Sequence, residues 1–183
     1  HWTIYNGNWT VQNGELIQSD EALSNTNIYA SLNQTLSNRY LYHFKVKLSG
    51  SGTNKRFGFH FFSDSANFDN RGNSYFIWFR QNTSTLEFYK VVNNSFTTYQ
   101  HVVNNVVTND NQWYDIIVTY DRITGEIKVW RNGIFLGSWT DPTPLPSNGG
   151  KYISFRTGNS VINITEIKVY RSRNPQVTVT LGN

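Results

Sequence analysis

The feature that most restricts the fold of this chain is an alternation of apolar and polar residues along nearly its whole length. Side chains of a β-strand point to opposite faces in turn, so a period of two predicts strands with one buried face. About a dozen short runs show this period, and no stretch of ten residues shows a helical one. The runs are residues 9–12, 15–18, 27–32, 40–48, 56–62, 74–80, 85–92, 96–103, 113–120, 126–131, 134–139, 152–156 and 161–170.

Turn sequences stand between these runs. Asn13-Gly14 and Asn132-Gly133 are typical of two-residue hairpin loops, because both positions of a type I′ turn need a positive φ. Thr124-Gly125 marks a third turn, and the 24 asparagines of the chain suit turns better than helix interiors. Together these patterns predict an all-β fold, a two-sheet antiparallel β-sandwich.

Charge and composition exclude several classes of function. The net charge of +4 is mild, and the longest basic run is Lys55-Arg56, which argues against nucleic acid as a partner. No apolar run approaches the ~18 residues of a membrane span, so we expect no membrane insertion. Cysteine is absent, which removes disulfides, thiolate nucleophiles and Cys-ligated zinc.

The 183 residues fit one domain, which we expect over residues 1–171. Residues 172–183 are expected to form a C-terminal edge strand, over Val177 to Leu181, or a linker to a further domain. Because the chain begins with His1 and has no methionine, we expect it to be a processed piece of a larger multidomain protein.

The second half carries a series of familiar segments. These are residues 113–121 (WYDIIVTYD), 124–129 (TGEIKV), Asn132-Gly133, 150–156 (GKYISFR) and 167–170 (IKVY). With residues 9–16 (WTVQNGEL), their order resembles the concanavalin A-like lectin/glucanase superfamily, meaning laminin-G-like and carbohydrate-binding jelly-roll modules of secreted bacterial proteins. The resemblance covers residues 8 to 171. It implies a concanavalin A-like jelly roll that is secreted or on the cell surface, but fold alone does not give function.

The spacing of the acidic residues argues against a catalytic function. Glycoside hydrolases of this superfamily need two carboxyl groups roughly 5 to 10 Å apart, and alternate positions of one strand would provide them. The sequence has no Glu-x-Asp or Glu-x-Glu, and Asp20 and Glu21 are neighbours that would face opposite ways. The four histidines lack metal-binding spacing, and Gly-x-Ser-x-Gly is absent. We therefore expect that the protein is not an enzyme. A glycosidase is kept as the third hypothesis.

Calcium is the one metal for which the sequence offers ligands, and several lectin-like members of the superfamily hold it. The loop of residues 64–73 is rich in oxygen donors, with Asp64, Asn67 and Asp69 as candidate ligands of a structural calcium. Arg71 in the same loop would oppose a cation. The alternative is a loop whose Asx side chains bind their own backbone.

A sugar-reading surface is predicted from strand alternation. If Tyr75, Ile77 and Phe79 face the core, the outward residues of four neighbouring strands would form one concave face. Pyranose rings stack on aromatic side chains, and their hydroxyls need fixed polar partners. Trp78 and Tyr89 would stack on the sugar, and the hydrogen-bonding residues would be Arg80, His60, His43 and Glu87. With the opposite register, Trp78 and Phe76 would be core residues.

A second candidate site follows residue 130, with Trp130, Trp139, Asp141 and Arg156 as ligand-binding residues. Loops at the ends of sandwiches often carry function. The alternative is that Asp141 caps the turn that contains Pro142, Pro144 and Pro146, and pairs with Arg156.

These observations predict a non-catalytic, lectin-like carbohydrate-binding module, with a polysaccharide or cell-surface glycan as its partner. The alternative from another class is a laminin-G-like structural or protein-adhesion domain. That alternative predicts a buried Trp78 and a His60 that is paired within the sheet.

Overall fold

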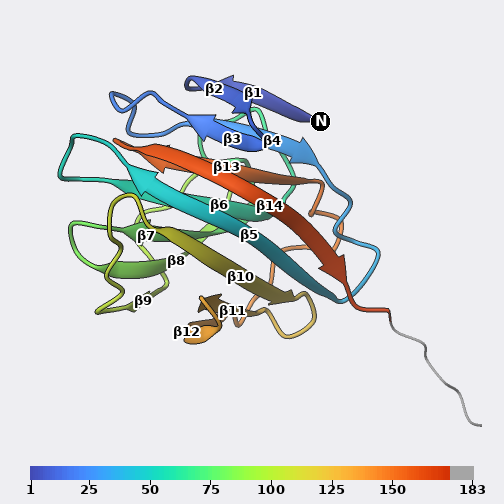
Figure 1. Ribbon diagram of the computed structural model, residues 1–183. Coiled ribbons are helices and arrows are strands. Elements are labelled where there is room, and N and C mark those ends of the chain that lie inside the picture. The colour runs from blue at the N-terminus through green and yellow to red at the C-terminus, as the bar shows by residue number, and fades with distance from the viewer. Residues whose placement is uncertain (174–183) are drawn as a thin grey trace, which may run out of the picture.

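The computed structural model describes residues 1–173, which form two antiparallel sheets of seven strands each, packed face to face (Figure 1). Sheet A has the order β1 (Trp2–Asn6), β4 (Asn27–Ser31), β13 (Tyr152–Gly158), β6 (Arg56–Ser63), β7 (Ser74–Arg80), β8 (Thr85–Val91) and β9 (His101–Val103). Sheet B has the order β12 (Ile134–Thr140), β11 (Glu126–Arg131), β10 (Trp113–Asp121), β5 (Arg39–Ser49), β14 (Val161–Arg171), β3 (Glu15–Gln18) and β2 (Trp9–Gln12). The predicted sandwich is confirmed.

The two Asn-Gly sequences make the hairpins that their composition predicts. Asn13 and Gly14 have φ values of 51° and 79°, and Asn132 and Gly133 have 52° and 76°. A positive φ at both central residues matches the right-handed twist of the strands that they join. These turns fix the registers of β2 with β3 and of β11 with β12.

Two elements differ from the sequence-based prediction. The first is β1, which pairs with β4 and packs Trp2 against Phe155 with ring centroids 5.4 Å apart. The second is β9, which covers only residues 101–103 of the expected 96–103. The chain leaves the sheet before β9 because Phe96 packs over Phe76 and Tyr89, at 5.2 and 5.1 Å between centroids.

The core between the sheets is rich in aromatic side chains. Phe44 of β5, Phe59 of β6 and Phe155 of β13 lie pairwise 5.1 Å apart at their ring centroids. Burial alternates strictly along β10 and nearly so along the other strands of the middle of sheet B, whose polar residues face outward. The inner faces of both sheets thus form one continuous core.

Sheet A is unusual because its outer face is covered as well. Residues 74–79 of β7 are buried without interruption, although their side chains alternate between two faces. Outward side chains form a second apolar cluster of Phe76, Trp78, Tyr89 and Val91, with Phe96 packed against it. The cover consists of the loops between β6 and β7 and between β8 and β9.

Residues 174–183 lie outside the part that the structure describes, so the expected strand at 177–181 stays a prediction. Within residues 1–173 there is no helix long and apolar enough to cross a membrane.

Candidate functional site

The structure brings five of the six predicted sugar-binding residues to one place, the outer face of sheet A. Cross-strand pairing aligns Gly58, Trp78 and Glu87 in one row. The next row aligns His60, Phe76 and Tyr89, and Arg80 follows Trp78 at the end of β7. The register predicted from Tyr75, Ile77 and Phe79 is confirmed, since all three belong to the core between the sheets.

His43 does not belong to this face, so its placement beside the other five was wrong. It lies on β5, which pairs with β10 and β14 in sheet B. Its Nε2 lies 2.8 Å from Oδ1 of Asp115 on the outer face of that sheet. The chain crosses from one sheet to the other after β5, and strand alternation alone carries no signal for such a crossing.

The aromatic rings of the face are buried rather than open for stacking. Trp78 is 3% exposed and Tyr89 is 5% exposed. The indole ring of Trp78 lies across Gly58, where a Cβ atom would be 2.3 Å from its Cε3. The ring of Tyr89 stacks on Phe76 at 4.3 Å between centroids. Open stacking on these two rings, as predicted from alternation, is therefore wrong for this structure.

His60 is fully buried in the same layer. Its Nδ1 lies 3.1 Å from Oγ of Ser74, and its ring stacks on Phe76 at 4.3 Å. Burial, aided by the charges of Arg71 and Arg156, holds the pKa of His60 well below its ordinary value. The imidazole is therefore neutral at physiological pH and acts as part of the packing.

Three arginines gather around Trp78, two of which were not expected there. Arg156 comes from β13, with its guanidinium carbon 5.2 Å from the Trp78 ring centroid. Arg56 comes from β6 and lies 5.6 Å from the same ring. Arg80 completes the group, and we call Arg56, Arg80 and Arg156 the arginine cluster. The sequence signal for Arg56 was its outward position in the alternation of β6.

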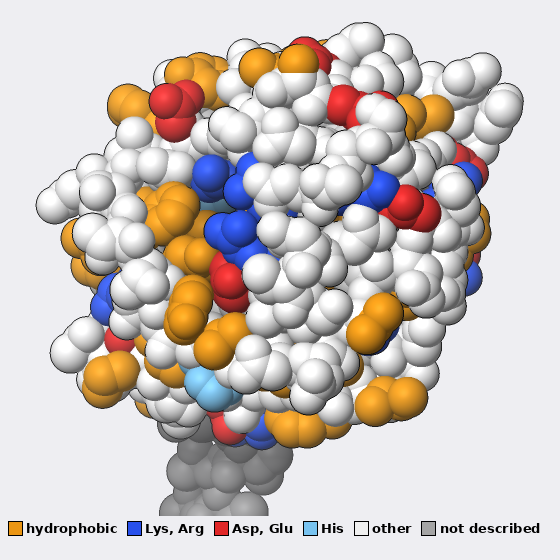
Figure 2. Space-filling view, turned by 90° about the vertical axis from the view of Figure 1, so that its left-hand side faces the viewer, with side chains coloured by type: hydrophobic (Ala, Val, Ile, Leu, Met, Phe, Trp, Pro, Cys, Tyr) orange, Lys and Arg blue, Asp and Glu red, His pale blue; other side chains and the backbone are white. Residues whose placement is uncertain are grey.

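One carboxylate, that of Glu87, is in hydrogen-bond contact with the arginine cluster. Nε of Arg80 donates to Oε2 of Glu87 at 2.8 Å, and the hydroxyl of Tyr89 donates to the same oxygen at 2.6 Å. Burial, together with the bond to Glu87, raises the pKa of Tyr89 to about 12, so its hydroxyl stays protonated at neutral pH. Figure 2 shows Lys and Arg side chains gathered beside an acidic side chain and a band of hydrophobic ones.

The cluster differs sharply from Arg71 in its hydrogen bonds. Arg71 uses all five of its N–H donors, on Ser154, Asn25 and the carbonyl oxygens of residues 26, 69 and 155. Each arginine of the cluster makes one hydrogen bond to the described residues: Arg56 to Asn159, Arg80 to Glu87 and Arg156 to Asn70. Nε of Arg56 and Nε of Arg156 are buried without a partner among them.

The second candidate site does not assemble. Asp141 is buried, accepts from the hydroxyl of Tyr75 at 2.8 Å and pairs with Lys90 at 2.7 Å. It also caps the following turn through the N–H of Thr143 at 3.0 Å, as the alternative interpretation predicted. Trp139 packs edge-on against Tyr75 with ring centroids 6.1 Å apart. The pairing of Asp141 with Arg156 was wrong, because Arg156 lies on the outer face of sheet A.

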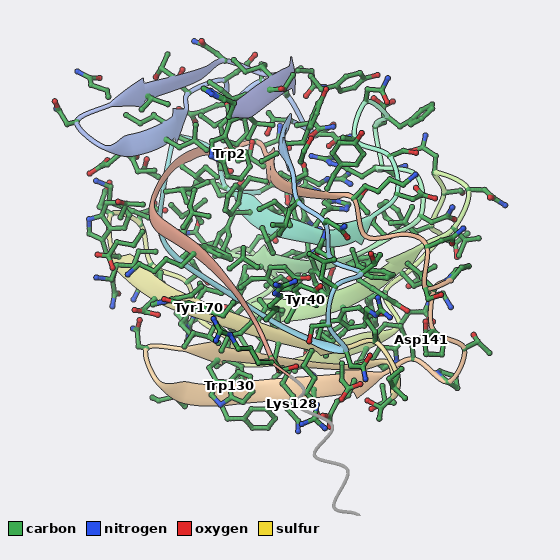
Figure 3. The ribbon with its side chains drawn as sticks, turned by 90° about the vertical axis from the view of Figure 1, so that its right-hand side faces the viewer. Trp2, Tyr40, Lys128, Trp130, Asp141 and Tyr170 are labelled. Carbon is green, nitrogen blue, oxygen red and sulfur yellow. The ribbon has the colours of Figure 1, made fainter. Side chains whose placement is uncertain are left out.

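Trp130 lies elsewhere, on the outer face of sheet B (Figure 3). A groove of about 550 Å³ opens beside it, with Lys128 and the exposed Tyr170 also in its lining. Four of the five charged side chains that line this groove are paired, since Arg39 contacts Asp121 at 2.7 Å and Lys128 contacts Glu126 at 2.8 Å. It therefore presents fewer free polar groups than the arginine cluster.

The predicted calcium loop uses its oxygens within the protein. Both carboxylate oxygens of Asp64 accept from Asn73, at 2.8 and 2.6 Å. The backbone oxygen of Asp69 accepts from Arg71, whose guanidinium is buried under this loop, while Asn67 is exposed. Among the described residues no three His, Asp or Glu side chains converge on one point. The contacts of Asp64 and Arg71 fit the Asx-loop alternative.

Comparison with known proteins supports the fold of this chain and does not identify its ligand. No family model and no curated protein matches the sequence. The carbohydrate-binding module CBM66 from Bacillus subtilis aligns with a TM-score of 0.72 and 12% identity, over 92% of this chain and 94% of that one. The exoplasmic/lumenal domain of VIP36, in a Ca²⁺- and mannose-bound form, gives 0.70 and 14%, over 97% and 85%.

A sialidase gives a TM-score of 0.70 and 11% identity, over 93% of this chain but only 17% of the sialidase. Identities this low establish architecture and not ligand. On the strand order, the two-sheet core and these alignments, the chain has the concanavalin A-like jelly-roll fold of lectins and carbohydrate-binding modules.

Proposed function

We propose that this protein is a non-catalytic carbohydrate-binding module that binds a glycan on the outer face of sheet A. The ligand lies over the arginine cluster and Glu87, at the end of the face that the covering loops leave accessible. Arg56 and Arg80 are partly exposed there. Solved structures with the same fold include proteins named as carbohydrate-binding modules and lectins, which supports the proposal.

The observation that carries the proposal is unused hydrogen-bonding capacity on a rigid surface. Three guanidinium groups offer fifteen N–H donors, and the described residues accept three hydrogen bonds from them. Each group projects from a central strand of sheet A, so its position is fixed before a ligand arrives. Preorganised donors of this kind suit the hydroxyl groups of a sugar.

The acidic residues of the same sheet favour a binding role over catalysis. Glu87 is the only Asp or Glu in the seven strands of sheet A. Glycoside hydrolysis requires two carboxyl groups on either side of the scissile bond. Glu87 also hydrogen-bonds to Arg80 and Tyr89, which favours a role in orienting donors rather than in transferring a proton.

The apolar contact to the sugar is assigned to the edge of the face. Tyr99 is 42% exposed and packs edge-on against Tyr89 with ring centroids 6.4 Å apart. Phe96 is partly exposed beside it. Trp78 and Tyr89 form the buried layer against which the arginine cluster packs. Tyr99 provides the exposed ring on which a pyranose stacks.

The setting that we propose is extracellular, within a larger chain. A matching solved domain forms only 17% of the sialidase that contains it, and the VIP36 domain is exoplasmic or lumenal. Neither observation concerns this chain directly, so location and parent architecture stay part of the proposal.

A laminin-G-like protein-adhesion domain is the second candidate, and one observation favours it. Trp78 is buried and His60 contacts Ser74 within the sheet, as that reading predicts. In this case the second apolar cluster would serve stability only. The free donors of the arginine cluster would then contact a protein surface.

The test is a screen of the folded chain against a broad panel of immobilised glycans, with and without a chelator. We expect selective binding that persists with chelator, because the calcium loop offers no free ligand set. Arg80→Gln should weaken binding at least tenfold, since a charged donor contributes about 1.5–3 kcal/mol. Lys168→Gln is the matched control: it removes the same charge from an exposed site on sheet B.

No binding to any glycan by a chain with a cooperative melting transition would overturn the proposal and favour the adhesion domain. Equal weakening by Arg80→Gln and Lys168→Gln would show that binding does not depend on this face.

A further inference from the structure

The arginine cluster carries more positive charge than its surroundings neutralise. Arg80 is paired with Glu87, and the other basic residue in the strands of sheet A, Lys90, is paired with Asp141. Arg56 and Arg156 have no ion-pair partner within 4.0 Å among residues 1–173. Both charges therefore lie beside Trp78 without a carboxylate in ion-pair contact, and Glu87 and Asp69 act on Arg56 and Arg156 only from farther away.

Burial makes this arrangement costly for the protein alone. Arg156 is 9% exposed, and its Nε has no hydrogen-bond partner among the described residues. Burial and the nearby charge of Arg56 lower the pKa of Arg156 to about 10, which still leaves it protonated at neutral pH. Isolated buried charges are rare, because they need a paired charge or several hydrogen bonds.

Arg71 shows that an arginine can be buried in this protein without leaving N–H donors unpaired. It is also fully buried beneath the same loops, and every one of its N–H groups has an acceptor. The fold thus supplies acceptors to a structural arginine and leaves the arginine cluster without them. Arg56 and Arg156 extend from two neighbouring strands, and their guanidinium carbons lie 5.6 and 5.2 Å from the Trp78 ring centroid.

We propose that the glycan bound on this face carries a carboxylate, as a uronic acid or another sugar acid does. This inference rests on the function proposed above and names the ligand class. A guanidinium fork binds a planar carboxylate through two parallel hydrogen bonds, and a neutral hydroxyl cannot supply the missing charge. Glu87 repels the carboxylate from one side, which directs it toward Arg56 and Arg156.

The experiment compares each acidic glycan with its own neutral form. Polygalacturonate, alginate, hyaluronan and sialyllactose are titrated into the full chain beside their carboxyl-reduced counterparts, in which –COO⁻ has become –CH₂OH. We expect at least one acidic form to bind ten times more tightly than its reduced form. Dextran sulfate serves as a competitor that has charge without carboxylate geometry.

Two conservative variants separate charge from shape. Arg56→Lys and Arg156→Lys keep the positive charge and lose the fork, so each should weaken binding of the acidic glycan at least fivefold. Lys168→Arg, on the exposed face of sheet B, should leave binding unchanged. Melting curves establish that each variant is folded before it is titrated.

Equal affinity for the acidic and reduced forms would overturn this inference while the carbohydrate-binding function stands. Dextran sulfate that competes as well as the acidic glycan, with full affinity in both lysine variants, would also overturn it. If no glycan of either kind binds, the proposed function itself fails.

Discussion

At the scale of single residues, this protein uses the same side chain in two ways. Arg71 is a structural element whose donors tie the loop of residues 64–73 to β13 and to Asn25 and Thr26, just before β4. Arg156 lies two residues beyond Ser154 on β13, in a layer of aromatic rings, with one hydrogen bond to Asn70. Since burial is similar, the difference in hydrogen-bond saturation is the observation on which the proposed binding role of Arg156 rests.

Gly58 is required by the position of Trp78. A Cβ atom at residue 58 would lie 2.3 Å from Cε3 of Trp78 and 2.6 Å from the backbone oxygen of Ile77. We expect Gly58→Ala to lower the free energy of unfolding by about 1–3 kcal/mol, measured by urea denaturation, because a core strand cannot yield. Gly52→Ala is the control, with its nearest neighbour at 3.7 Å; an equal loss there would contradict the steric reason.

His60 makes stability depend on pH in a defined direction. Its folded-state pKa is well below that of the unfolded chain, about 6.5, because it is buried and faces Arg71 and Arg156. Below that pH only the unfolded chain takes up the proton, so stability is retained above pH 6.5 and lost as the pH falls. The loss approaches about 1.4 kcal/mol per pH unit.

Urea unfolding of wild type and His60→Gln between pH 7.5 and 5 measures this effect. The wild-type free energy of unfolding should fall more steeply than that of the variant, in which the other histidines are unchanged. Parallel curves would mean that His60 is protonated in the folded protein.

At the scale of elements, β7 and β8 show what sequence periodicity can and cannot predict. Alternation placed Tyr75 and Ile77 inside and Trp78 and Glu87 outside, as the structure has them. It could not predict that the outer side would be covered, because a period of two gives no position for loop residues such as Phe96 and Arg71. Apolar residues on both faces of 74–80 were the available signal.

The sequence pattern also could not predict to which of the two sheets each strand belongs. Asn13-Gly14 and Asn132-Gly133 fix local pairing, so those hairpins were predictable. His43 and Arg156 belong to strands whose partners are remote in sequence, and a local pattern does not specify them. As a result, five of the six predicted residues share one face. That Arg56 and Arg156 lie beside them became clear only from the three-dimensional structure.

The loop between β8 and β9 stabilises the outer face of sheet A through Phe96. Its ring contacts Phe76 and Tyr89, and Arg156 lies 5.6 Å from it. We expect Phe96→Ala to cost about 2 kcal/mol in urea denaturation, below the 3–5 kcal/mol of a fully buried ring because Phe96 is partly exposed. Phe68→Ala makes the same change at a 47% exposed site and should cost less than about 0.5 kcal/mol. Similar losses would contradict a covering role for Phe96.

At the scale of the protein, the outer faces of the two sheets differ in character. Sheet B turns an alternating polar face to solvent, with charges that are paired with one another. Sheet A has two apolar layers, and the arginine cluster stands at the border of the outer one. Support from both sides makes the central strands rigid, which is the property that a binding surface without moving parts needs.

The central claim is that a glycan binds over the arginine cluster and not in the groove of sheet B. The most direct measurement follows the ¹⁵N signals of the tryptophan indoles, assigned by single Trp→Phe variants, during titration with a glycan that the screen selects. The Trp78 ring centroid lies 5.6 Å from Arg56 and 5.2 Å from Arg156, and Trp130 lines the groove. We expect the Trp78 signal to shift with the occupancy of the site while the Trp130 signal stays in place. A shift of Trp130 with an unchanged Trp78 would contradict the central claim.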